Sequence, residues 1–418
     1  MTPALAAQKV WQFPLVIALC GAVAVGASLN LISDRLTKAI LSSTEPLALS
    51  PLPLLQSPSY AAALRAEDPH KAHQWLDEHL KHRPLFAPAW LQKAEIERKL
   101  QMTKDAAISA DIAQSLWPYR PAHLWRLVNF YINLGEDQRA LETLERYLNA
   151  RPHQALRVLV LARRIESSPE ILAQRFGTLP TGRASDQAAP AHAVRLLLAT
   201  DRFKDPDLVR EFWRGFTPEI KTTQSVAFRF IDAMLNAGDN PSAIAAWAGL
   251  GKEAIVIPQI NNGDFELPLA EGGLGWRTRE LKGARIRLDR EIYWSGKRSL
   301  AVDFDGTENL NYYHLSQRIP IEPKQRYLVS GWWRGNNIST RSGMYLEAYT
   351  QNPRAIARSD PHRASWPWEP FSIEFDAPEG VNLLTLRLRR NKTDALDNLL
   401  SGSIWLDGIE IKALGAAN

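Results

Sequence analysis

The sequence predicts a multidomain protein in which an α part precedes an all-β part. Three observations indicate this order: an apolar run over residues 13–32, a recurrence of proline and alanine every 34 residues between 60 and 155, and an alternation of apolar and polar residues after Asn262. The first fits a transmembrane helix, the second an α-solenoid and the third an antiparallel β-sandwich. We therefore expect these three parts in that order along the chain.

The composition is typical of globular protein and does not indicate a nucleic-acid partner. Of the 418 residues, 50 are basic and 45 are acidic, so a net charge of +5 is spread over a large surface. Nucleic-acid binding needs a denser concentration of Lys and Arg. The single cysteine, Cys20, excludes an intramolecular disulfide and a zinc site built from several cysteines.

Residues 1–40 contain the predicted membrane anchor, an uncleaved signal-anchor helix within residues 10–33. Its apolar stretch of 20 residues, Phe13–Ile32, is about as long as a helix that crosses the hydrocarbon layer. A cleaved signal peptide is the alternative, but its apolar part is shorter and ends in small residues. A lipoprotein at Cys20 fits poorly because the preceding Leu19 is bulky. The flanking charges are too balanced to indicate an orientation. Residues 41–59, rich in proline and serine, predict a stiff spacer.

Residues 60–252 predict a helical solenoid of about five helix pairs. Two sets of residues recur with a spacing of 34: Pro84, Pro118 and Pro152, and Ala72, Ala106 and Ala140. The clearest copy, Leu124–Pro152, contains Gly135 for a turn between two helices and Ala140 for their close approach. This period and this order of residues resemble a tetratricopeptide (TPR) repeat array. The resemblance implies a groove for a partner protein, and the alternative is a purely structural stalk.

Residues 255–418 predict the β-sandwich, because short alternating segments are separated there by Gly, Pro, Asn and Asp. The segment Gln351–Pro370, with Trp366 and Trp368 among prolines, is expected to be a loop. The expected strands are Ala284–Leu288, Ser299–Phe304, Tyr312–Ile319, Tyr327–Trp333, Met344–Thr350, Phe371–Phe375, Leu383–Arg389 and Ile404–Ile411.

A series of short motifs runs through this second region: Asn262–Glu266, Trp276, Gly296 with Ser299 and Leu300, Tyr327–Trp332 and Ile404–Ile409. Their order resembles that of carbohydrate-binding modules of the family 4/9 type, which are jelly rolls of the galactose-binding-like class. The resemblance implies a glycan or polysaccharide as ligand.

The same resemblance implies a structural calcium ion that ties the first strand of the module to the last. Glu266 and Asp407 match the two acidic positions, and calcium prefers oxygen ligands. Gly408 departs from the second aspartate that is usual next to Asp407. The alternative is that Glu266 and Asp407 only cap turns.

Strand parity indicates which side chains of the sandwich face solvent. In Met344–Thr350 and in Leu383–Arg389 the apolar residues share one face and belong in the core, so the polar and tyrosine side chains lie opposite. Tyrosine rings stack on sugar rings, and arginine forks hold hydroxyl or carboxylate groups. Either Trp332 or Trp333 also points outward, and parity does not decide which. The candidate ligand-binding residues are Tyr345, Glu347, Tyr349, Arg387, Arg389 and Trp332.

No nucleophile elbow, phosphate-binding loop or dinucleotide fingerprint occurs in the sequence, so we expect no enzymatic activity. The expected function is that of a scaffold in the bacterial inner membrane, single-pass and mostly periplasmic, in envelope or exopolysaccharide assembly or export. The sandwich would bind the polysaccharide and the solenoid a partner protein. The alternative is a docking subunit of a membrane complex that binds no sugar. A glycan-active enzyme with an unfamiliar site is a third hypothesis.

Overall fold

The computed structural model describes residues 57–177, 188–251, 256–339, 341–350, 356–394 and 398–416. The chain divides into two compact units. The first contains the residues up to Gln154 together with the short segment Arg164–Glu166. The second contains Ala155–Arg163 and the residues from Ser167 onward. The predicted anchor within residues 10–33 and most of the predicted spacer lie outside the described residues. Among the described residues, no helix is both long enough and apolar enough to cross a membrane.

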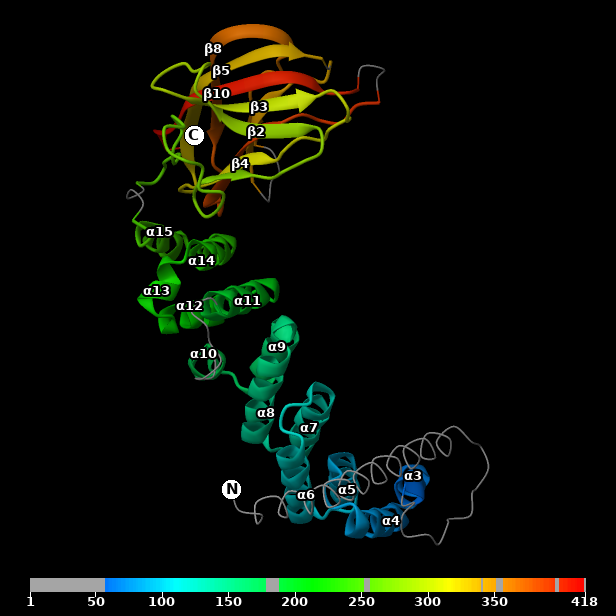
Figure 1. Ribbon diagram of the computed structural model, residues 1–418. Coiled ribbons are helices and arrows are strands. Elements are labelled where there is room, and N and C mark those ends of the chain that lie inside the picture. Colours follow the sequence, from blue (N-terminus) through cyan, green and yellow to red (C-terminus); the bar gives the residue numbers. More distant parts are fainter. Residues whose placement is uncertain are drawn as a thin grey trace, which may run out of the picture. The chain divides into compact units, whose positions relative to one another are not determined.

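The first unit consists of antiparallel helix pairs (Figure 1). Three pairs follow one another, α3 with α4, α5 with α6 and α7 with α8, and the short 3-10 helix η1 comes next. The first helix that the structure describes, α3, begins at Ser57, so the last three residues of the predicted spacer are helical. The bounds are α3 Ser57–Arg65, α4 Pro69–His82, α5 Ala87–Lys99, α6 Thr103–Leu116, α7 Pro121–Leu134, α8 Asp137–Ala150 and η1 Pro152–Gln154.

The predicted 34-residue period is confirmed as a helix–turn–helix repeat. Ala72, Ala106 and Ala140 are fully buried on the second helices of the pairs, where the lack of a longer side chain lets two helices approach closely. Gly135 ends α7 in the left-handed region at φ 79°, a conformation that side chains with a Cβ rarely adopt. The three recurring prolines follow the ends of α4, α6 and α8 and prevent those helices from continuing.

The second unit begins with further helices. Asp205 caps α12 by accepting a hydrogen bond from the Leu208 N–H, and its other oxygen lies 2.7 Å from Nε of Arg163. Gly238 ends α14 at φ 80°, as Gly135 ends α7. The bounds are α9 Ala155–Ile165, α10 Pro169–Phe176, α11 Ala188–Arg202, α12 Pro206–Gly215, α13 Pro218–Thr222, α14 Gln224–Ala237 and α15 Asn240–Ala248.

The β-sandwich completes the second unit and consists of two antiparallel five-stranded sheets, with strand orders β1-β4-β9-β6-β7 and β2-β3-β10-β5-β8 (Figure 1). The core between the sheets is rich in Leu, Ile, Val and aromatic side chains, including fully buried Phe265 from the Asn262–Glu266 motif. The strands are β1 Trp276–Thr278, β2 Ala284–Asp289, β3 Ser299–Asp305, β4 Leu315–Pro320, β5 Gln325–Ile338, β6 Tyr345–Tyr349, β7 Ala357–Arg358, β8 Ala364–Asp376, β9 Leu383–Arg389 and β10 Ser401–Ala416.

The predicted loop Gln351–Pro370 is wrong for the part that the structure describes, because it contains β7 and the first half of β8. Trp366 on β8 packs into the sandwich core. The prolines of β8 are tolerated because this strand lies at the edge of its sheet, where one row of backbone N–H groups needs no partner. Strand β1 was not expected at all, since three residues show no alternation that a pattern could detect.

Within the second unit, α14 contacts the sandwich through charged and polar groups. Asp232 of α14 forms ion pairs with Arg277 of β1 and with Arg318 of β4. Arg318 also donates to Oδ1 of Asn236 at 2.8 Å. Burial lowers the pKa of Arg318 to about 10, and the nearby Asp232 opposes this shift. The last helix pair and the sandwich therefore share a polar seam, in which one carboxylate pairs with two guanidinium groups.

We expect Asp232→Ala to lower the free energy of unfolding of this unit by about 3 kcal/mol, because it leaves the largely buried guanidinium of Arg318 without its carboxylate. Urea unfolding of the full chain, followed by circular dichroism, measures the difference. Asp207→Ala is the matched control, because the carboxylate of Asp207 pairs with Arg210 at the surface, where a pair is worth less than about 1 kcal/mol. Equal losses in the two variants would contradict the assigned seam.

Candidate functional site

The outward face of the sheet that contains β6 and β9 carries five of the six predicted ligand-binding residues. The strands pair in register, so Tyr345 lies opposite Arg389, and Glu347 opposite Arg387. The alternate residues of both strands, among them Leu346, are fully buried in the core. We call this outward surface of β6, β9 and β7 the arginine–tyrosine face.

An ion pair and a stacked ring form the centre of the arginine–tyrosine face. Nε of Arg387 lies 2.5 Å from Oε2 of Glu347. The guanidinium carbon of Arg387 lies 3.9 Å from the ring centroid of Tyr349, within the range of a cation–π interaction. Glu347 is only 5 % exposed, so Arg387 covers the carboxylate and presents its own outer edge.

A second arginine extends the face along β9. Arg389 donates to Oδ1 of Asn311 at 2.5 Å and to the carbonyl oxygen of Tyr312. Its guanidinium carbon lies 5.8 Å from the ring centroid of Tyr313, a side chain that is 41 % exposed. Arg389 is therefore held in place beside an accessible aromatic ring.

Tyr345 contributes packing to the face rather than an open ring. It is 3 % exposed, and Arg358 of β7 lies 5.5 Å from its ring centroid. Its hydroxyl oxygen accepts a hydrogen bond from Asn391 at 3.0 Å. The accessible aromatic surface thus comes from exposed Tyr313 and half-buried Tyr349.

The charges on the face leave an excess of two cations. The guanidinium groups of Arg358, Arg387 and Arg389 stand against the single carboxylate of Glu347, so three positive charges minus one negative charge gives +2. Guanidinium groups bind carboxylates in a two-pronged geometry, and aromatic rings stack on the C–H faces of sugars. The arrangement is suited to a ligand that combines flat C–H surfaces with negative charge.

Sequence reasoning missed Tyr313, Arg358 and Asn311. Arg358 falls in the segment expected to be a loop, and Tyr313 lies next to Tyr312, which pairs alone with Arg390 ahead of β4. Tyrosine is common in strands, so residue type does not distinguish Tyr312 from Tyr313. Only the pairing of Tyr312 with Arg390, far along the chain, shows that Tyr313 is the one that reaches the face.

The structure does not bring Trp332 together with the other candidates. Trp332 lies on β5 in the opposite sheet and points away from the core, while Trp333 is the buried member of the pair. The ring of Trp332 stacks on Trp294, with centroids 3.7 Å apart and planes tilted by 14°. Trp368 lies near Trp294 at 6.4 Å, so these indoles form an aromatic patch on the other side of the sandwich.

The two predicted calcium ligands both bind backbone amides of the loop between β2 and β3. Oδ2 of Asp407 accepts hydrogen bonds from the N–H groups of Trp294 at 2.8 Å and Ser295 at 3.0 Å. Burial is the main cause that raises the pKa of Asp407, and the negative charge of Glu266 adds to it. The two carboxylates are therefore close enough to influence one another.

Glu266 holds the end of the same loop. Its Oε1 accepts the N–H groups of Lys297 at 2.7 Å and Arg298 at 3.1 Å. The close approach requires Gly296, since a Cβ at that position would lie 2.3 Å from Oε1 of Glu266. The guanidinium of Arg298 donates to the carbonyl oxygen of Glu266 and lies 4.0 Å from its carboxylate.

This donor set does not fit a calcium ion in the observed arrangement. Calcium needs six to eight oxygen ligands, whereas the oxygens of Glu266 and Asp407 face N–H groups and a guanidinium. Within the part of the chain that the structure describes, no group of three or more His, Cys, Asp and Glu side chains has metal-binding geometry. Calcium stays a prediction.

A third carboxylate, Asp289, holds the start of the loop. It accepts hydrogen bonds from the indole N–H of Trp405 at 2.7 Å, from the N–H of Glu291 at 2.9 Å and from Arg287 at 2.6 Å. Burial alone would raise the pKa of Asp289, but these donors outweigh it and lower the pKa to about 2. Asp289 therefore stays ionised down to acidic pH in the folded protein.

No protein-family model and no curated protein matches the chain. Solved structures resemble its two parts. A family 4 carbohydrate-binding module, described as "CBM4 structure and function", is 13 % identical and covers 37 % of this chain and 99 % of its own, with a TM-score of 0.28. The CBM22-1 xylan-binding domain of Xyn10C from Paenibacillus barcinonensis is 19 % identical and covers 40 % of this chain and 99 % of its own, with a TM-score of 0.25.

The MamA protein is 13 % identical, covers 49 % of this chain and 98 % of its own, and has a TM-score of 0.23. These solved structures are carbohydrate-binding modules and the MamA protein, and their likeness to this chain is one of structure only. Similarity at this level assigns no role to any residue.

We expect Asp289→Asn to lower the free energy of unfolding at neutral pH by about 2 kcal/mol. This figure follows because folding lowers the pKa of the Asp289 carboxyl from 3.8 to about 2. Because the folded pKa lies below the unfolded one, this contribution is complete above pH 3.8 and is lost as the pH falls towards 2. Urea unfolding at a series of pH values measures it. Asp376→Asn, at an exposed position, is the control. A difference in free energy of unfolding between the wild type and Asp289→Asn that does not shrink in acid would contradict the role assigned to Asp289.

We expect calcium chloride and a chelator to give the same thermal unfolding midpoint, because backbone amides already occupy the carboxylate oxygens of Glu266 and Asp407 and a guanidinium lies against Glu266. Differential scanning calorimetry of the full chain in each buffer measures the midpoint. A calcium-dependent rise that disappears in Glu266→Gln would instead establish the calcium site predicted from the sequence.

Proposed function

We propose that the arginine–tyrosine face binds an acidic polysaccharide. The observation that carries this proposal is the side-by-side arrangement of Arg387 stacked on Tyr349 and Arg389 beside Tyr313, with an excess of two positive charges. Each arginine is fixed by an ion pair or hydrogen bonds, so little side-chain entropy is lost when a ligand binds. The ring of Tyr349 or Tyr313 stacks on a sugar, and the free guanidinium edges hold its carboxylate.

The proposal gives the rest of the chain a scaffolding role without catalysis. The TPR-like array docks a partner protein, as helical repeats present extended surfaces for such contacts. Residues 10–33 anchor the chain in the inner membrane, and the bulk of the chain lies in the periplasm. Such a protein serves envelope or exopolysaccharide assembly or export by holding the polysaccharide next to a partner.

A protein-docking role without sugar is the second candidate. One observation favours it: the same sheet that carries the arginine–tyrosine face already contacts a helix at its β1 and β4 end, where Arg277 and Arg318 pair with Asp232 of α14. Because this sheet packs on a helix at β1 and β4, the arginines of its other strands could bind a helix of a partner protein by the same kind of ion pair.

We expect Arg387→Ala to weaken binding of uronic-acid oligosaccharides by at least about tenfold, because it removes the cation and the support of the Tyr349 ring together. Arg387→Lys keeps the charge but not the planar fork and should recover part of the affinity. A glycan array probed with the full chain in detergent, followed by calorimetric titration of the hits, measures both effects.

Arg326→Ala is the matched control, since Arg326 is a half-exposed arginine in the opposite sheet. Circular dichroism confirms that each variant is folded. An array on which the folded wild type binds no glycan would overturn the proposal and favour the docking role.

A further inference from the structure

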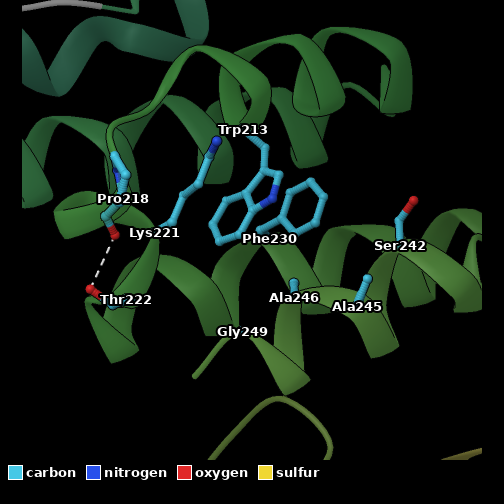
Figure 2. A pocket seen from close by; sticks show the side chains of 9 residues that line it. All are labelled: Trp213, Pro218, Lys221, Thr222, Phe230, Ser242, Ala245, Ala246 and Gly249. Carbon is cyan, nitrogen blue, oxygen red and sulfur yellow. Dashed lines mark hydrogen bonds between the residues drawn. The ribbon is translucent and has the colours of Figure 1, made fainter. Parts of the chain in front are cut away.

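A cavity of about 450 Å³ lies among α12, α13, α14 and α15 of the second unit, away from the sandwich residues described above (Figure 2). The rings of Trp213 from α12 and Phe230 from α14 stack inside it with centroids 4.2 Å apart and planes tilted by 10°. Phe230 is buried, whereas Trp213 is partly accessible, so the indole forms a flat apolar floor. A cavity of this volume lies in the range of ligand pockets.

The opposite wall consists of small residues on a single face of α15. Ser242, Ala245, Ala246 and Gly249 all line the cavity, with spacings of three, four and seven residues from the first. Such spacings place side chains on one face of a helix. Figure 2 shows this wall across from the two rings, with Ala245 and Ala246 pointing towards them. The small side chains leave room for another element to approach α15 closely.

A cation lies beside the cavity without a carboxylate partner. Nζ of Lys221 on α13 donates to the carbonyl oxygen of Arg214 at 3.2 Å and lies 6.0 Å from the ring centroid of Trp213. Among the described residues, no Asp or Glu forms an ion pair with it, although other arginines on these helices, such as Arg214 and Arg210, have such partners. The apolar floor is thus accompanied by one positive charge available to a ligand.

We infer that this cavity binds an amphipathic helix of a partner protein, which inserts one large apolar side chain over Trp213 and sets a carboxylate against Lys221. The occupant is a helix because each repeat of this chain buries a helix against alanines such as Ala106 and Ala140, and α15 offers a similar small-residue face to a further helix. The inference rests on the proposed protein-docking function of the array and specifies its site and the chemistry of its partner.

A peptide selection with the full chain as bait tests the inference. The library consists of helical peptides of about 16 residues, which form about four turns, randomised on one face. Enriched peptides should combine a large apolar residue with Asp or Glu one turn away. Their affinity should fall at least about tenfold for Ala245→Trp, which fills the cavity, and for Lys221→Glu, which reverses the charge.

Two matched controls make the result specific. Ala248→Trp adds the same side chain at another exposed position of α15 that does not line the cavity, and Arg229→Glu makes the same charge reversal on α14. Both should keep the affinity of the wild type. Enrichment of basic peptides would overturn the inference, as would equal binding by Ala245→Trp and Ala248→Trp.

The outcomes also separate this inference from the proposed function. Peptides that bind all variants equally would show docking elsewhere on the array. The proposed docking role would then be retained, and the cavity would be rejected as its site. A library without any enriched peptide overturns the cavity as a docking site, while glycan binding at Arg387 is decided separately by the array experiment.

Discussion

Carboxylates that bind backbone amides hold the loop between β2 and β3, and the organisation of the sandwich depends on them. Asp289, Asp407 and Glu266 come from three distant positions in the chain, and each accepts N–H groups of residues 291–298. The three acids accept hydrogen bonds along the whole length of the loop, so together they restrain it from opening. The loop also supports Trp294 in its stack on Trp332.

The same chemistry joins the helices of the second unit to the sandwich. Asp232 forms ion pairs with Arg277 and Arg318, so a single side chain of α14 decides whether two guanidinium groups of the sheet have a carboxylate partner. On the arginine–tyrosine face, Glu347 plays the corresponding part for Arg387. The outer face of one sheet therefore uses arginines twice, against a helix at β4 and towards solvent at β9.

The repeats and most strands could be predicted from the sequence, because their signals are local. The period of alanines such as Ala106 and the alternation in Leu383–Arg389 reflect packing within one element and its neighbour. Parity placed Arg387 and Tyr349 on one face, but it carries no information about which sheet a strand joins. Trp332 was therefore grouped with residues of the opposite sheet, and Arg358 was missed because β7 has only two residues.

The position of the last strand has a consequence for how the protein is made. Strand β10 lies in the centre of its sheet, between β3 and β5, and β9 is likewise central in the other sheet. Each sheet lacks its central strand until β9 or β10 has been synthesised, whereas each helix pair contacts mainly its neighbours and can fold as it emerges. During synthesis, the nascent sandwich therefore exposes open strand edges for longer than any other part of the chain, and this interval is when it most needs a chaperone.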